Sequence, residues 1–90
     1  MITFIYGISM ENQIIMYGTI WCGDCHQSRR LLDRHQVAYT WIDIDRDPEA
    51  KAYVKTLNGG IQVVPTILFP DGSILVEPSD PELAAKIEVS

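Results

Sequence analysis

The chain has 90 residues, 47% of them hydrophobic, so it can form one small domain whose core needs neither a metal nor a disulfide to hold it together. The formal net charge of −5 argues against a nucleic-acid partner, because phosphate binding needs a clustered positive surface. The adjacent basic pair Arg29 and Arg30 is more typical of a solvated helix face.

Residues 1–11 are predicted to be an N-terminal extension of a domain that covers residues 12–90. The stretch "MITFIYGIS" is apolar, but Gly7 and Ser9 interrupt it, and no Lys, Arg or clear cleavage site marks it as a secretory signal. It is also too short to span a bilayer. An extra strand, a disordered lead-in and a later start at Met10 remain open. We expect a cytoplasmic protein with no membrane partner.

The first half of the domain predicts strand, helix and strand. The run "QIIMYG" (13–18) is apolar and closed by glycine, which indicates a buried strand. A helix to about Gln36 is expected next, and "VAYTWIDID" (37–45) predicts a second strand because it is rich in β-branched and aromatic residues. One stripe of that helix holds Cys25, Ser28, Leu32 and His35, with Leu31 beside it.

The second half predicts helix, hairpin and helix. Asp47 can cap a helix that has Pro48 at its first position and stops at Asn58-Gly59-Gly60. Strands over 65–69 and 73–77 are joined by the turn signal Pro70-Asp71-Gly72. Ser79 and Glu82 are spaced as the capping box of a last helix. The apolar faces of these two helices are Ala50, Tyr53, Val54 and Leu57 in the first, and Leu83 and Ile87 in the second.

The predicted order is therefore β-α-β-α-β-β-α, an α/β fold with a four-stranded mixed sheet flanked by three helices. Strands joined by helical crossovers are expected to run parallel, and the final hairpin adds an antiparallel strand. This layout puts Cys22 at the carboxyl end of the first strand, the edge at which open α/β sheets place their active sites.

Three interpretations compete for the two cysteines, Cys22 and Cys25. Zinc needs four ligands, and the other nitrogen candidates, His26 and His35, do not match the usual paired spacing. A structural disulfide would close so small a loop that it removes little entropy from the unfolded chain. A redox couple fits better, because a helix N-terminus stabilises a thiolate at Cys22 while Cys25 lies one turn in, within reach. A reducing cytoplasm also favours catalytic or metal-binding use of a close pair.

The order of motifs resembles one known family. "TIWCGDC" followed some forty residues later by "NGGIQVVPTILFPDGS" is similar to the glutaredoxin branch of the thioredoxin superfamily, and most similar to its mycoredoxins. These share a Trp-Cys-Gly-x-Cys motif, an Asn-Gly-Gly before Val-Pro-Thr and an Asp-Gly-Ser hairpin. The resemblance covers about residues 13–87 and implies the thioredoxin/glutaredoxin fold.

The resemblance also implies roles for particular residues. Cys22 matches the nucleophile and Cys25 the resolving cysteine. Pro65, which the sequence places at the start of a strand, matches the family's cis-proline, and Val64 would present backbone groups to a bound peptide or thiol.

Four further positions have implied roles, and three of them also have a structural alternative. Thr19 and Trp21 flank the nucleophile, although Trp21 could instead pack in the core. Ser79 and Asp80 fall where glutaredoxins hold the amino end of glutathione, and a simple helix cap is the alternative. The chain has Glu77-Pro78 where many glutaredoxins have Gly-Gly, and it has no basic residue in 19–25.

The sequence therefore predicts a thiol–disulfide oxidoreductase that reduces mixed disulfides with a low-molecular-weight thiol, or protein disulfides, through the Cys22/Cys25 couple. No bound cofactor or metal is expected. Glutathione, mycothiol or another small thiol is the expected co-substrate, and a thiol or flavoprotein reductase system is the expected source of electrons. We expect a monomer whose protein partners contain disulfides.

Three alternatives stay open. The chain could be a thioredoxin-like electron donor to ribonucleotide reductase, an iron–sulfur cluster scaffold, or a redox-inert interaction module. Cys25 argues against the scaffold, because monothiol glutaredoxins that bind clusters usually lack the second cysteine. A reversible midpoint potential would exclude the inert module.

Overall fold

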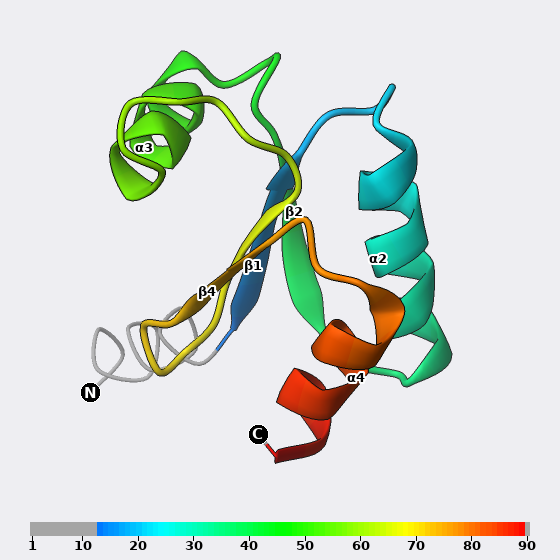
Figure 1. The fold of residues 1–90 in the computed structure, drawn as a ribbon. Coiled ribbons are helices and arrows are strands. Elements are labelled where there is room, and N and C mark those ends of the chain that lie inside the picture. The colour runs from blue at the N-terminus through cyan, green and yellow to red at the C-terminus, as the bar shows by residue number, and fades with distance from the viewer. Residues whose placement is uncertain (1–12, 90) are drawn as a thin grey trace, which may run out of the picture.

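The computed structural model describes residues 13–89, so the predicted N-terminal extension and the alternatives considered for it lie outside the described residues. Within them the predicted order of elements and the four-stranded mixed sheet with three helices are confirmed (Figure 1). The elements are β1 (Ile14–Gly18), α2 (Gly23–Arg34), β2 (Tyr39–Asp43), α3 (Pro48–Leu57), β3 (Thr66–Leu68), β4 (Ile74–Val76) and α4 (Asp80–Val89).

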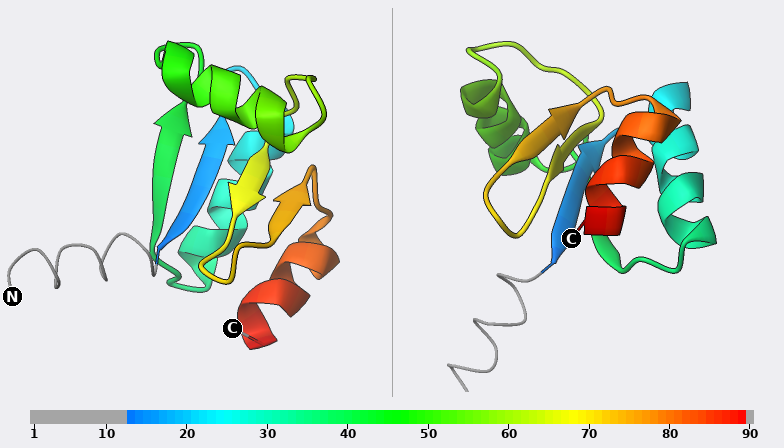
Figure 2. Two further views of the ribbon diagram at one scale, coloured as in Figure 1. Left: turned by 90° about the vertical axis from the view of Figure 1, so that its left-hand side faces the viewer. Right: turned by 60° about the horizontal axis from the view of Figure 1, so that its bottom comes forward.

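The direction of the third strand differs from the prediction. The sheet order is β2-β1-β3-β4, with β1 parallel to β2 as expected, but β3 runs antiparallel to β1. The reason is the course of α3, which lies across the carboxyl ends of β1 and β2 and does not return along the sheet (Figure 2, left). The chain therefore enters β3 at the edge where β1 and β2 end. This brings the start of β3 next to the turn that carries the cysteines.

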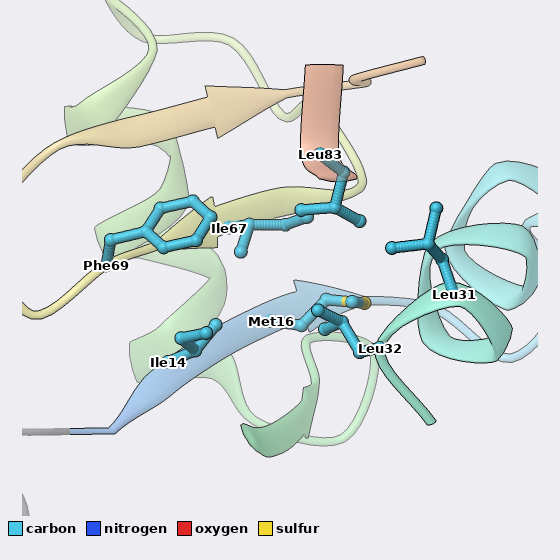
Figure 3. Packing of buried hydrophobic residues seen from close by; sticks show 7 residues of the cluster. All are labelled: Ile14, Met16, Leu31, Leu32, Ile67, Phe69 and Leu83. Carbon is cyan, nitrogen blue, oxygen red and sulfur yellow. The ribbon is translucent and has the colours of Figure 1, made fainter. Parts of the chain in front are cut away.

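Two apolar clusters hold the layers together. Alternate residues of β1 face opposite sides of the sheet, as the period of a strand requires. On one side, α2 and α4 pack on β1 and β3 (Figure 3), and on the other side α3 packs alone (Figure 1). The first cluster is Ile14, Met16, Leu31, Leu32, Ile67, Phe69 and Leu83, and the second is Tyr17, Ile44, Ala50 and Val54. Each fully buried side chain contributes roughly 1.5–3 kcal/mol.

The predicted caps are present. Asp47 Oδ1 accepts a hydrogen bond from Ala50 N–H at 3.0 Å at the start of α3. At the start of α4, Ser79 N–H donates to Glu82 Oε1 at 2.8 Å, and Glu82 N–H donates to Ser79 Oγ at 3.3 Å. Both arrangements satisfy helix N–H groups that have no partner inside the helix.

Two side chains from the predicted helix stripes are exposed in the structure. His35 lies past the last turn of α2 as its C-cap, and it is exposed. Gln36 then takes a left-handed φ of 57°, which ends the helix. Tyr53 on α3 is 43% exposed, although its ring still contacts the Tyr17 ring in a tilted arrangement with 5.9 Å between centroids. Across residues 13–89, no helix is long and apolar enough to cross a membrane.

Candidate active site

Cys22 occupies the N-cap of α2, in the turn that follows β1. Its backbone is extended, with φ −88° and ψ 116°, and its Sγ accepts a hydrogen bond from Cys25 N–H at 3.2 Å. A Ser or Asp oxygen usually takes this position. Here a sulfur faces the N–H groups and the positive dipole end of a helix, which is a setting that stabilises a thiolate.

Cys25 lies one turn further along α2 and has no exposed surface, whereas Cys22 is 8% exposed. Burial raises the pKa of the Cys25 thiol to about 12, and its hydrogen bond with Cys22 and the charges of Cys22 and Asp24 act in the same direction. A backbone hydrogen bond from Thr19 lowers that pKa and only partly offsets the rise. Cys25 is therefore a protonated thiol at neutral pH.

A glycine creates the space that Cys25 fills. A Cβ at Gly18, the last residue of β1, would lie 2.6 Å from Cys25 Sγ and 2.7 Å from Trp41 Cη2. The sulfur and the indole ring can therefore approach the strand end only because position 18 has no side chain. From the sequence, Gly18 indicated only the end of a strand.

The Val64–Pro65 segment, which leads into β3, lies beside the nucleophile candidate. The Val64–Pro65 peptide bond is cis, as the resemblance implied, and Cys22 Sγ lies 3.9 Å from the carbonyl oxygen of Val64, to which the thiol donates. The antiparallel direction of β3 produces this contact. In a parallel third strand, Pro65 would have started at the opposite edge of the sheet.

The two residues that flank the motif are placed very differently. Thr19 is fully buried, and its carbonyl accepts a hydrogen bond from Cys22 N–H at 3.3 Å. Its hydroxyl has no hydrogen-bond partner among the described residues. Trp21 is 68% exposed, so the alternative that it packs in the core is wrong.

Ser79 and Asp80 stand at the start of α4. The Ser79 hydroxyl and backbone N–H are both used in the capping box with Glu82, and Asp80 is the first residue of the helix. The contacts of Ser79 thus match the structural alternative, the helix cap.

Two contacts of the cysteine turn could not be named from the sequence. Trp21 Nε1 donates a hydrogen bond to Asp45 Oδ2 at 2.8 Å, and His26 Nε2 lies 2.6 Å from the carbonyl oxygen of Ile20. Asp45 is level with the turn because β1 pairs with β2 in a parallel register that sets Gly18 opposite Asp43, and local sequence patterns do not contain that register. Within the described part of the chain, no three His, Cys, Asp or Glu side chains are grouped to hold a metal ion.

Known proteins resemble this chain in both sequence and fold. The glutaredoxin family model matches residues 14–74. The chain is 38% identical over 77 residues to mycoredoxin 1 of Corynebacterium glutamicum, covering 86% of this chain and 95% of that protein. It is 39% identical over 74 residues to a Mycobacterium tuberculosis protein that carries the name glutaredoxin, covering 82% and 88%. In fold it is similar to the crystal structure of the glutaredoxin from Methanosarcina mazei, with a TM-score of 0.72, 23% identity and coverage of 86% and 79%.

Proposed function

The chain belongs to the glutaredoxin family of thiol–disulfide oxidoreductases, and from this premise we propose a dithiol mechanism in which Cys22 is the nucleophile and Cys25 the resolving thiol. One observation carries the assignment. Cys22 Sγ is at the helix N-terminus and accepts a hydrogen bond from Cys25 N–H, and the residue keeps 8% exposure, whereas Cys25 has none.

In the first step, the Cys22 thiolate attacks one sulfur of a substrate disulfide. A bond forms between Cys22 Sγ and that sulfur, the substrate S–S bond breaks, and the other sulfur leaves as a thiolate that takes a proton from water. The carbonyl of Val64, 3.9 Å from Cys22 Sγ, and the backbone around Pro65 form the opposite wall for the incoming group.

In the second step, Cys25 loses its proton to water and attacks Cys22 Sγ. The mixed disulfide breaks, the second substrate thiolate leaves, and a Cys22–Cys25 disulfide remains, so two electrons have passed from the dithiol to the substrate. Burial raises the pKa of Cys25, and because only the thiolate attacks, this step becomes faster as pH rises toward that pKa. An external thiol or reductase then restores the dithiol.

The substrates that we propose are mixed disulfides with a low-molecular-weight thiol such as glutathione or mycothiol, and protein disulfides. A small-thiol or flavoprotein reductase system would supply the electrons. The absence of Lys and Arg from residues 19–25 supports a partner that needs no carboxylate clamp within this motif.

The experiment is disulfide reduction in a dithiol-coupled assay with Cys22→Ser and Cys25→Ser. Cys22→Ser should abolish activity, because no other thiol at the helix N-terminus can make the mixed disulfide. Cys25→Ser should keep the first half-reaction and lose only internal resolution. Full activity of Cys22→Ser would refute the assignment of the nucleophile.

A further inference from the structure

We propose that Asp45 determines which disulfides the site accepts, by holding the Trp21 ring beside Cys22 and by presenting a negative charge next to it. The inference deepens the proposed function, since it concerns substrates that reach Cys22. No part of the mechanism above uses Asp45.

The exposed Trp21 ring is held by a hydrogen bond. This ring adjoins the nucleophile in sequence and is 68% exposed, so packing alone leaves it several rotamers. Its Nε1–H donates to the Asp45 carboxylate at 2.8 Å across 24 residues of sequence. A charge-assisted bond of this length favours one orientation of the ring, and a ring held in that orientation on the residue before the nucleophile can act as a preformed wall of the site.

Asp45 is itself held in place. Its backbone N–H donates to Asp43 Oδ1 at 3.0 Å, and the preceding residue, Ile44, is buried and donates its N–H to the carbonyl of Gly18 at 3.0 Å. Asp45 is therefore fixed to the same strand ends that carry the cysteine turn. Because these backbone contacts hold Asp45, its carboxylate can position the Trp21 ring.

The charge of Asp45 also affects which disulfides reach Cys22. The Asp45 side chain remains 39% exposed, and the motif itself adds Asp24. The two cations that follow β2 stand beside carboxylates, Lys51 at 3.9 Å from Asp45 Oδ1 and Arg46 at 3.9 Å from Asp43 Oδ2. Because the Asp45 and Lys51 side chains are both well exposed and 3.9 Å apart, Lys51 offsets only part of the Asp45 charge. A disulfide that carries carboxylates should then meet repulsion here, and one that carries ammonium groups should be attracted.

The charge role is tested with three small disulfides: cystamine, which is cationic, 2-hydroxyethyl disulfide, which is neutral, and 3,3′-dithiodipropionate, which is anionic. Their intrinsic reactivities differ, so the cationic-to-anionic ratio of kcat/KM is compared between variants. Asp45→Asn keeps an oxygen acceptor for the indole and removes the charge. It should lower the ratio about two- to fivefold at low salt, with little change in 1 M salt.

Asp33→Asn is the matched control, because it makes the same change in net charge on an exposed position near the far end of α2. It should leave the ratio unchanged. A ratio that is the same in wild type, Asp45→Asn and Asp33→Asn overturns the charge role. Equal decreases in both variants overturn it as well, because they would reflect net charge alone.

The positioning role is tested with Asp45→Ala, which removes the acceptor. The kcat/KM for the neutral disulfide should fall about three- to tenfold, while Asp45→Asn should keep it near the wild-type value. In NMR spectra, the indole N–H signal of Trp21 should lose protection from solvent exchange in Asp45→Ala and keep it in Asp45→Asn. The variant Trp41→Phe assigns that signal.

Unchanged turnover of the neutral disulfide in Asp45→Ala, together with an indole N–H that exchanges freely, would overturn the positioning role. The proposed function fails separately, through full activity of Cys22→Ser. If activity is lost in Cys22→Ser but does not change in the Asp45 variants, the dithiol mechanism stands and only this inference is refuted.

Discussion

Cys22 and Cys25 have the same side chain and are separated by only two residues, but their surroundings differ. Cys22 ends a turn, so its sulfur meets helix N–H groups and keeps some exposure. Cys25 already belongs to the helix, and the α-helical turn rotates it onto the buried face, against Gly18 and Trp41. The asymmetry that a dithiol mechanism needs thus follows from the position of the helix start.

A substitution at Gly18 tests the close packing of Cys25 and Trp41 against the end of β1. Gly18→Ala should lower the free energy of unfolding by about 1–3 kcal/mol, because the added methyl group overlaps Cys25 Sγ and the Trp41 ring. It should also slow the formation of the Cys22–Cys25 disulfide. Urea denaturation and rapid-quench mass measurement read the two effects.

Gly23→Ala is the matched control for that substitution. A Cβ at Gly23, the first residue of α2, would meet no atom within 4 Å. The change should leave stability unaltered or raise it by up to ~1 kcal/mol, since alanine favours helix. Equal stability of the two alanine variants would contradict the close packing described for Gly18.

At the scale of elements, the site is built where β1 ends, α2 begins and β3 begins. Hydrophobic periodicity and turn residues were enough to predict all seven described elements, because both signals are local. The direction of β3 was predicted wrongly, since nothing in the periodicity of 48–57 states whether a helix returns along the sheet or crosses its edge. The contact between Asp45 and Trp21 depends on the register of β1 with β2, which local patterns do not contain.

A substitution of Ser79, at the start of α4, can distinguish a helix cap from a contact with the thiol partner. Ser79→Ala should cost about 0.5–2 kcal/mol of stability, because Glu82 N–H loses its acceptor. The KM for a glutathione mixed disulfide should stay the same. Stability is read by denaturation and KM by steady-state kinetics.

Glu82→Ala breaks the same capping box without touching the hydroxyl of Ser79. It should lower stability by a similar amount and also leave KM unchanged. A KM that rises in Ser79→Ala alone would show that this hydroxyl contacts the thiol partner.

At the scale of the whole molecule, the buried thiol links folding to pH. Burial raises the pKa of Cys25 from its ordinary value of 9.0 to about 12, so the folded chain keeps a proton that the unfolded chain releases. This contribution to stability is complete below about pH 9 and is lost as pH rises from 9 toward 12, where the unfolded state ionises first.

Under reducing conditions, the free energy of unfolding should therefore fall between pH 9 and 11 in the wild type. The fall should be shallower in Cys25→Ala, although that variant starts from a lower stability because of the cavity. Tyr17, whose pKa is also raised by burial, contributes equally to both proteins and cancels in the comparison. Parallel curves would contradict the buried, protonated state of Cys25.

The central claim is that Cys22 attacks the substrate and Cys25 resolves the intermediate, and intact mass measurement after mixing with 2-hydroxyethyl disulfide tests it most directly. The wild type should lose two hydrogens and retain no adduct. Cys25→Ser should hold one substrate half on Cys22, and Cys22→Ser should hold none. An adduct that forms on Cys25 in Cys22→Ser as fast as on Cys22 in Cys25→Ser would contradict the account.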